Sequence, residues 1–125
     1  MRKTLTLVSL FAFCVLIFSG FVLNTSTATV APKFKMSKKI DAIVQGKCYG
    51  CHSDKGKAEK AKAKLKWDDL ASLPAADLKK KMESIGMVVE KGAMPPARMV
   101  ENNPDMKLTD KETKALQKWA AKFSK

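Results

Sequence analysis

Apolar residues recur at helical spacing in three parts of the chain, 37–47, 74–91 and 109–123. Steps of three and four residues place side chains on one face of an α-helix. The apolar positions are Ile40, Ile43 and Val44 in the first part, Leu78, Met82, Ile85 and Val89 in the second, and Leu116, Trp119, Ala120 and Phe123 in the third. We therefore predict three amphipathic helices that bury these faces together.

Residues that favour helix ends mark the boundaries of these helices. Ser37 is suited to cap the first helix, and Pro74 to begin the second because its missing N–H is not needed in a first turn. Gly92 fits just past the end of the second helix. Thr109 and Glu112 match a capping box at the start of the third. Since no strand pattern occurs, the sequence predicts an all-α domain of three to four helices.

The segments between the predicted helices have a different composition. Residues 53–66 hold six lysines, which indicates a solvated loop or a frayed helical turn. Gly-Ala-Met-Pro-Pro at 92–96 interrupts regular structure, and we expect a loop from there to about Leu108. The apolar residues expected to cover part of the core between the first two helices are Trp67, Leu70 and Leu73.

The N-terminus has the pattern of an export signal. Two basic residues precede an uncharged, mostly apolar run, Leu5–Leu23, and small residues up to Ala31 offer cleavage sites. The run of 19 residues is also long enough to stay in a membrane as an uncleaved anchor. We therefore predict a signal peptide or anchor at 1–31. The exported, periplasmic domain is expected at 32–125, beginning with a short linker.

Residues 48–52 read Cys-Tyr-Gly-Cys-His and contain the only histidine of the chain. The third cysteine, Cys14, is expected to be an ordinary residue of the apolar run. A thioredoxin-type dithiol follows a strand, whereas a helix is predicted before this pair. A tetrahedral zinc site needs four ligands, and the exported part has three cysteines and histidines in total. C-x-x-C-H is the spacing of haem c attachment, so we favour one haem bound covalently through Cys48 and Cys51, with His52 as an iron ligand.

A second iron ligand has to come from another residue type, because no other histidine exists. Met94 follows two small residues and precedes two prolines, so a stiff loop presents its thioether. Met82 lies on a predicted apolar helix face and is expected in the core. We predict Met94 as the distal ligand, with Met99 next and an open site as a further alternative.

Residues 37–125 resemble class I c-type cytochromes, in particular the small single-haem domains of bacterial exported haem-binding proteins. The attachment motif ends a first helix, a "GAMPP" loop follows about forty residues later, and "LTDKETKALQKW" resembles the C-terminal helix. The resemblance implies a helical fold that wraps the haem, packing of the terminal helices against each other, ligation by His52 and Met94, and electron transfer. The lysine-rich segment 55–66 departs from the family pattern, in which this region is more aromatic.

The net positive charge of the chain indicates which partners it attracts. The chain carries +12, and the part after residue 31 keeps +10 because only Arg2 and Lys3 are removed. Such a surface attracts acidic partners, and no basic-aromatic interleaving points to nucleic acid. We expect an electron carrier, not an enzyme, that meets a redox partner with an acidic docking surface. Membrane contact is expected only if the N-terminal segment is retained. The alternative is a haem enzyme or a gas or redox sensor with an open or displaceable distal site.

Overall fold

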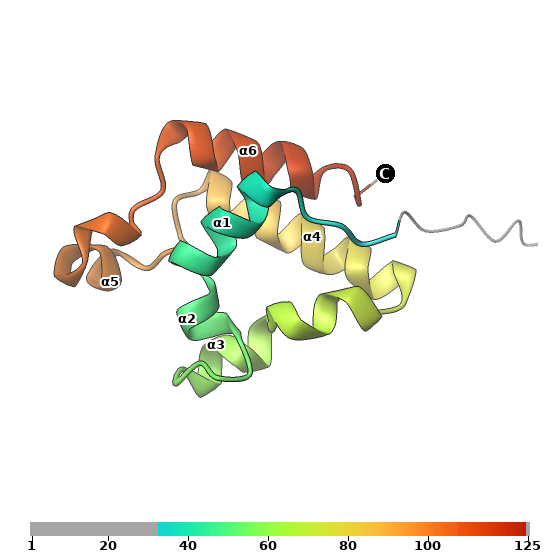
Figure 1. Cartoon of the computed structure of the whole chain (residues 1–125), viewed down its shortest axis with the longest axis horizontal. Coiled ribbons are helices and arrows are strands. Elements are labelled where there is room, and N and C mark those ends of the chain that lie inside the picture. The colour runs from blue at the N-terminus through green and yellow to red at the C-terminus, as the bar shows by residue number, and fades with distance from the viewer. Residues whose placement is uncertain (1–32, 125) are drawn as a thin grey trace, which may run out of the picture.

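The computed structural model describes residues 33–124, which are all-helical, as predicted (Figure 1). The α-helices are α1 (Lys38–Lys47), α2 (Tyr49–His52), α3 (Glu59–Lys64), α4 (Ala75–Glu90), α5 (Ala97–Asn102) and α6 (Asp110–Ala120). Two 3₁₀ helices, η1 (Trp67–Ser72) and η2 (Pro104–Met106), complete the list. The predicted signal or anchor segment at 1–31 lies outside the described residues.

The three long helices, α1, α4 and α6, are those that the sequence predicted. The Ser37 hydroxyl accepts a hydrogen bond from the Ile40 amide at 3.3 Å and caps α1. Gly92 follows α4 with a φ of 62°, a left-handed conformation that glycine adopts without strain. Thr109 and Glu112 form the predicted capping box of α6. The local signals in the sequence therefore identified the three helices and their caps, except that Pro74 precedes α4 as its N-cap and does not begin it.

The hydrophobic core lies where α4 and α1 pack against α6, which Figure 1 shows as a layer of crossing helices. All eleven apolar positions of the predicted helix faces are buried, together with Trp67 and Leu70. Trp67 stacks on Trp119, with ring centroids 6.0 Å apart. Burial on this scale contributes roughly 1.5–3 kcal/mol for each large apolar side chain.

The predicted linker before α1 is attached to the core. Phe34 packs against Trp119 and Phe123, with ring centroids 5.9 Å and 5.8 Å away. The Trp119 indole N–H donates to the Lys35 carbonyl oxygen at 3.0 Å. The described part of the segment has no regular structure, but Phe34 and Lys35 attach it to α6 and the turn that follows.

Three short helices occupy segments that we expected to be turns or loops. The lysine-rich segment contains α3, whose alanines and lysines favour helix, and the Lys81 ammonium donates to the Lys64 carbonyl at its end, at 2.5 Å. The loop expected from Gly92 to Leu108 contains α5 and η2.

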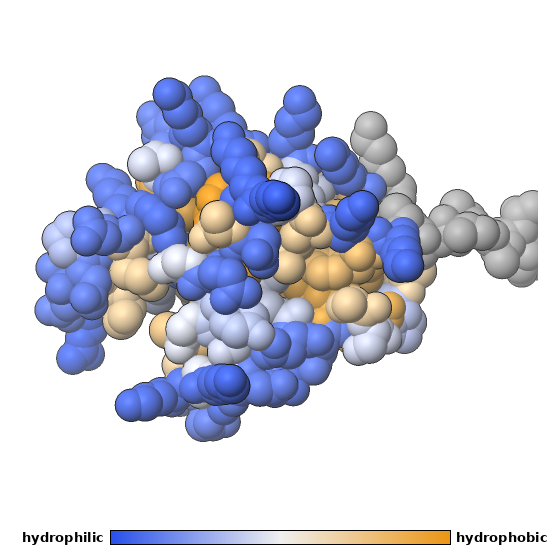
Figure 2. Space-filling model, viewed as in Figure 1, coloured by the Kyte–Doolittle hydropathy of each residue, from blue (hydrophilic) through white to orange (hydrophobic). Residues whose placement is uncertain are grey.

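Hydrophilic side chains dominate the visible face of the molecule (Figure 2). None of the helices in residues 33–124 is long and apolar enough to cross a membrane.

Glu112 joins the start of α6 to the end of α1. Its carboxylate accepts a hydrogen bond from the Thr109 amide at 2.8 Å and pairs with the Lys47 ammonium at 3.1 Å. The Thr109 amide, and after it Lys47, hold the pKa of the Glu112 carboxyl below its usual value. The Lys47 ammonium also donates to the Lys107 carbonyl oxygen at 2.6 Å. One ion pair and its capping hydrogen bonds thus fix α1, α6 and the preceding loop to one another.

Glu112→Gln should therefore destabilise the protein by about 1 kcal/mol near pH 7. A carboxyl with a lowered pKa stabilises the fold above its unfolded-state pKa, and this contribution disappears as the pH falls through the folded-state value. The difference between wild type and variant should accordingly begin to shrink below about pH 4.5 and close once the pH is below the folded-state pKa. Urea unfolding across pH measures this difference. Glu83→Gln is the control, because Glu83 is exposed and forms no ion pair within residues 33–124. A difference that persists at acidic pH would contradict the assignment.

Candidate functional site

The Cys-Tyr-Gly-Cys-His motif forms a tight turn at the end of α1. Cys48 closes α1 by donating its amide to the Val44 carbonyl at 2.9 Å. The Cys48 carbonyl then accepts from the Cys51 amide at 3.2 Å and from the His52 amide at 3.0 Å. Both cysteines are half-buried and free, and the histidine follows within the same turn. The structure therefore brings Cys48, Cys51 and His52 together, as the sequence predicted.

The His52 imidazole is held by the backbone on one side. Its Nδ1 lies 2.9 Å from the Leu65 carbonyl oxygen. Because a carbonyl oxygen only accepts, Nδ1 must carry the hydrogen, which leaves the Nε2 lone pair free to bind a metal. The role of Leu65 was not predicted, since a backbone carbonyl leaves no signature in the sequence.

The Cys48 thiol is not activated as a nucleophile. Burial raises its pKa to about 11, and the nearby Cys51 acts in the same direction. Cysteines of redox dithiols instead have lowered pKa values, because only the thiolate attacks a disulfide. The raised pKa of Cys48 disfavours the dithiol interpretation.

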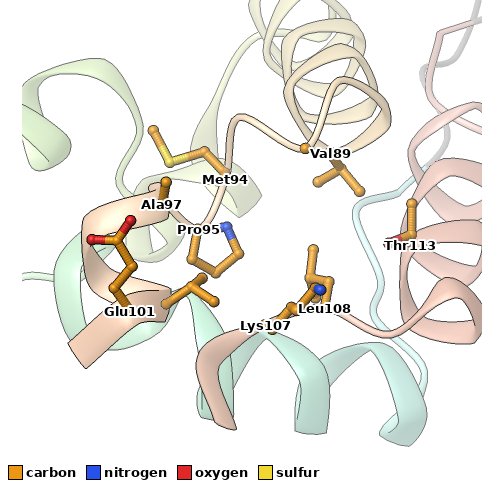
Figure 3. A pocket seen from close by; sticks show the side chains of 10 residues that line it. Val89, Met94, Pro95, Ala97, Glu101, Lys107, Leu108 and Thr113 are labelled. Carbon is orange, nitrogen blue, oxygen red and sulfur yellow. The ribbon is translucent and has the colours of Figure 1, made fainter. Parts of the chain in front are cut away.

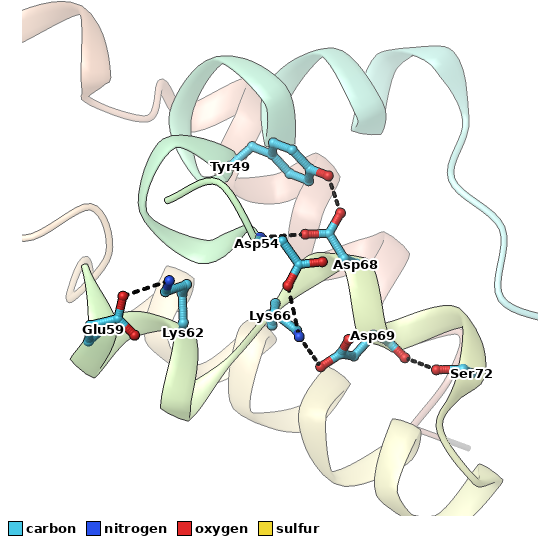
Figure 4. A network of polar contacts seen from close by, with 8 residues as sticks. All are labelled: Tyr49, Asp54, Glu59, Lys62, Lys66, Asp68, Asp69 and Ser72. Atoms are coloured by element: carbon cyan, nitrogen blue, oxygen red, sulfur yellow. Dashed lines mark hydrogen bonds and ion pairs between the residues drawn. The ribbon is translucent and has the colours of Figure 1, made fainter. Parts of the chain in front are cut away.

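Asp68 binds both the motif itself and the segment that follows it (Figure 4). Its carboxylate accepts hydrogen bonds from the Tyr49 hydroxyl and from the Asp54 amide, the latter at 2.7 Å. These two donors, Tyr49 first, lower the pKa of the Asp68 carboxyl. Lys66 adds ion pairs to Asp54 at 2.9 Å and to Asp69 at 3.1 Å. This Asp68 network was not predicted, because it joins residues that are up to 19 positions apart in the sequence.

Gly56 packs directly on the motif. A Cβ at this position would lie 2.8 Å from the Cys51 carbonyl oxygen and 2.9 Å from its carbon. Only backbone displacement of the attachment turn would relieve such contacts. The glycine is thus required for the close approach of two chain segments, not for its φ angle.

Gly56→Ala should lower the free energy of unfolding by about 1–3 kcal/mol, because overpacking forces the backbone to move. Gly46→Ala is the matched control, since nothing lies within 4 Å of a Cβ there and alanine favours the helix. Urea unfolding of both variants measures the difference. Equal stability of the two variants would show that the segment moves aside without cost.

Met94 lies in the loop that joins α4 to α5 and is half-buried. It borders a cavity of about 330 Å³ that is also lined by Val89, Leu108 and Thr113. In Figure 3 the Met94 side chain extends away from these three residues. The Met94–Pro95 peptide bond is cis. The thioether is therefore presented by a loop, as predicted, and is not part of the helical core.

The walls of this cavity include Met94 but none of the three attachment residues. The structure thus brings Cys48, Cys51 and His52 together where α1 meets α2, and places Met94 on a separate segment. Met99 is half-buried in α5, and Met82 is completely buried in the core, as expected.

Residues 33–124 are all-helical and place the His52 imidazole, fixed by the Leu65 carbonyl, beside two half-buried cysteines. Residues 55–122 match the family model described as haem-binding domain. The match covers more than half of the chain, which therefore belongs to this family of haem-binding proteins. It begins three residues after His52, so the attachment motif precedes the matched segment. No curated protein and no solved structure matches the chain.

A buried polar atom of the structure fits the binding of haem. The Trp67 indole N–H is buried and has no hydrogen-bond partner within residues 33–124. Buried donors are normally paired, so an orphaned one suggests a ligand that brings an acceptor. Haem carries propionate carboxylates, and Trp67 lies two residues from the carbonyl that orients His52. The residues present are compatible with the cofactor of the family.

Proposed function

We propose that this protein is an exported monohaem c-type cytochrome that transfers electrons. Cys48 and Cys51 would hold the haem covalently, and His52 would bind its iron. The observation that carries the proposal is the hydrogen bond from His52 Nδ1 to the Leu65 carbonyl, in a chain of the haem-binding domain family. It selects the tautomer whose Nε2 can act as ligand, directly after the C-x-x-C pair.

The bound haem would supply a one-electron couple, and the chain's own residues would keep its surroundings unchanged between the two oxidation states. The attachment turn is restrained by the Asp68 network on one side and by α1 on the other. The Leu65 carbonyl prevents rotation of the imidazole. Such restraints favour electron transfer, because little reorganisation then accompanies the change of charge.

Met94 is proposed as the distal ligand. Its loop position, its partial burial and its direction away from Val89, Leu108 and Thr113 support this role. Methionine raises the potential of a haem relative to histidine, and we expect a relatively positive value.

The exposed lysines of the segment after the motif would meet an acidic redox partner. Lys62 and Lys66 are neutralised by ion pairs with acidic side chains. The lysines of this segment that have no such pair within residues 33–124 are Lys55, Lys57, Lys60 and Lys64. Unpaired charges of one sign speed up encounters with the opposite charge and lose this effect at high salt.

The test is a visible spectrum of the full-length protein, expressed in a host that attaches haem c. We expect the separate α and β absorption bands of a c-type haem after reduction, and a weak red charge-transfer band after oxidation. Addition of carbon monoxide to the reduced protein should leave the spectrum unchanged. Immediate binding of carbon monoxide without the red band would favour the haem enzyme or sensor, and a colourless protein would refute the proposal.

A further inference from the structure

A second hollow lies far from the attachment turn, between the segment before α1 and the end of α6. It has a volume of about 520 Å³ and is open to solvent. Five lysines surround it, from three different elements of the chain. We name it the lysine groove, after Lys33, Lys35, Lys39, Lys118 and Lys122.

The groove is strongly and uniformly basic. No carboxylate is among its lining residues. None of its five lysines forms an ion pair within the described range 33–124, in contrast to Lys47, Lys62 and Lys66. The charges are therefore available to a ligand, and their repulsion favours an anionic surface over a second copy of the same face.

The floor of the groove is apolar but is not built for insertion into a bilayer. Trp119 and Phe123 line it, yet only 5% and 7% of their surfaces are exposed. The hydrogen bond from the Trp119 indole to the Lys35 carbonyl fixes the two walls. Figure 2 shows apolar surface near the start of the described chain, bordered by hydrophilic side chains. Lysines around a floor whose aromatic rings are nearly buried suit contact with charged headgroups, not with acyl chains.

The position of the groove in the chain also favours contact with a membrane surface. Lys33, which lines it, lies ten positions after the end of the apolar run Leu5–Leu23. As the predicted signal or anchor, that run would bring this face next to a membrane, so the inference rests on the export part of the proposed function. Basic residues beside an apolar segment are the usual means of binding anionic lipid.

The groove and the attachment turn lie at opposite ends of α1. Lys39 is in its first turn, and Cys48 directly follows its last residue. A helix of 10 residues is about 15 Å long. A surface bound at the groove would therefore leave the other end of α1 free.

We propose that the lysine groove docks on the anionic headgroups of a lipid membrane and turns the attachment turn away from the bilayer. The proposal rests on five lysines without ion pairs in the described residues, which surround one groove shortly after the apolar run in the chain. It does not depend on the cofactor or on electron transfer.

The test is amine labelling of the full-length protein in vesicles, read by mass spectrometry. Membrane-impermeant acetylation is compared in phosphatidylglycerol–phosphatidylcholine vesicles and in pure phosphatidylcholine vesicles. We expect Lys118 and Lys122 to react at least fivefold more slowly in the anionic vesicles, since a lysine close to an anionic surface gains roughly a fivefold preference for it. Lys79 and Lys80 on α4 are exposed controls and should keep their rates. Because the comparison is between lipids, a retained anchor does not obscure it.

Variants give a second measurement. Lys118→Gln with Lys122→Gln should abolish the extra protection of Lys35, whereas Lys79→Gln with Lys80→Gln should leave it. About 0.5 M salt should also remove the extra protection of Lys35, because this salt concentration shortens the Debye length to a few ångströms. Equal protection in neutral vesicles, equal protection of both lysine pairs, or no protection by any vesicle would overturn the proposal.

Discussion

Replacing Cys48 and Cys51 together with alanine should abolish covalent haem completely. Two thioether links require two thiols, and the only other cysteine of the chain, Cys14, lies outside the described domain. After extraction with acidified acetone, the wild-type polypeptide should keep all of its haem and the double variant none. The absorption spectrum of the extracted polypeptide measures the effect.

Cys14→Ala is the matched control and should retain covalent haem like the wild type. Each single variant should keep one link, because Cys48 and Cys51 occupy separate positions in the turn. The assignment of the attachment site would be contradicted by haem that resists extraction from the double variant.

Met94→Ala should remove the red charge-transfer band of the oxidised protein and lower its reduction potential. Loss of a thioether ligand removes the preference for ferrous iron, and axial ligands set haem potentials over roughly 0.8 V. We expect a fall on the order of 0.1 V or more. The reduced variant should also bind carbon monoxide, because the distal position would be open.

Two other methionines serve as controls for this variant. Met87 is half exposed on α4, and Met87→Ala should leave the spectrum as it is. Met99→Ala should do the same if Met94 is the ligand. A Met94→Ala protein with an unaltered spectrum, together with a changed Met99→Ala protein, would move the distal ligand to α5.

The helical framework was predictable because its signals are local. Ser37 and the Thr109–Glu112 box marked helix starts, and the apolar stripe from Leu78 to Val89 marked a buried face. Such features depend on residues within one or two turns of one another. The short helices escaped prediction because four to six residues carry too little periodicity.

The site was predictable only where its residues are adjacent in sequence. Cys48, Cys51 and His52 form one motif, and the structure places them in one turn. The Leu65 carbonyl and Asp68 come from a distant segment, and only folding brings them to the motif. The approach of Gly56 to the Cys51 backbone was equally hidden, because a glycine signals freedom of the chain but not its neighbours.

The acceptor that orients His52 is a main-chain atom, which has consequences for evolution. Replacement of the Leu65 side chain cannot delete that oxygen, so residue identity at this position is free to drift while the path of the chain is kept. Selection would act instead on whatever holds the path, such as the tryptophan two residues on. Sequence comparison alone would then overlook the atom that decides which nitrogen of the imidazole is left available.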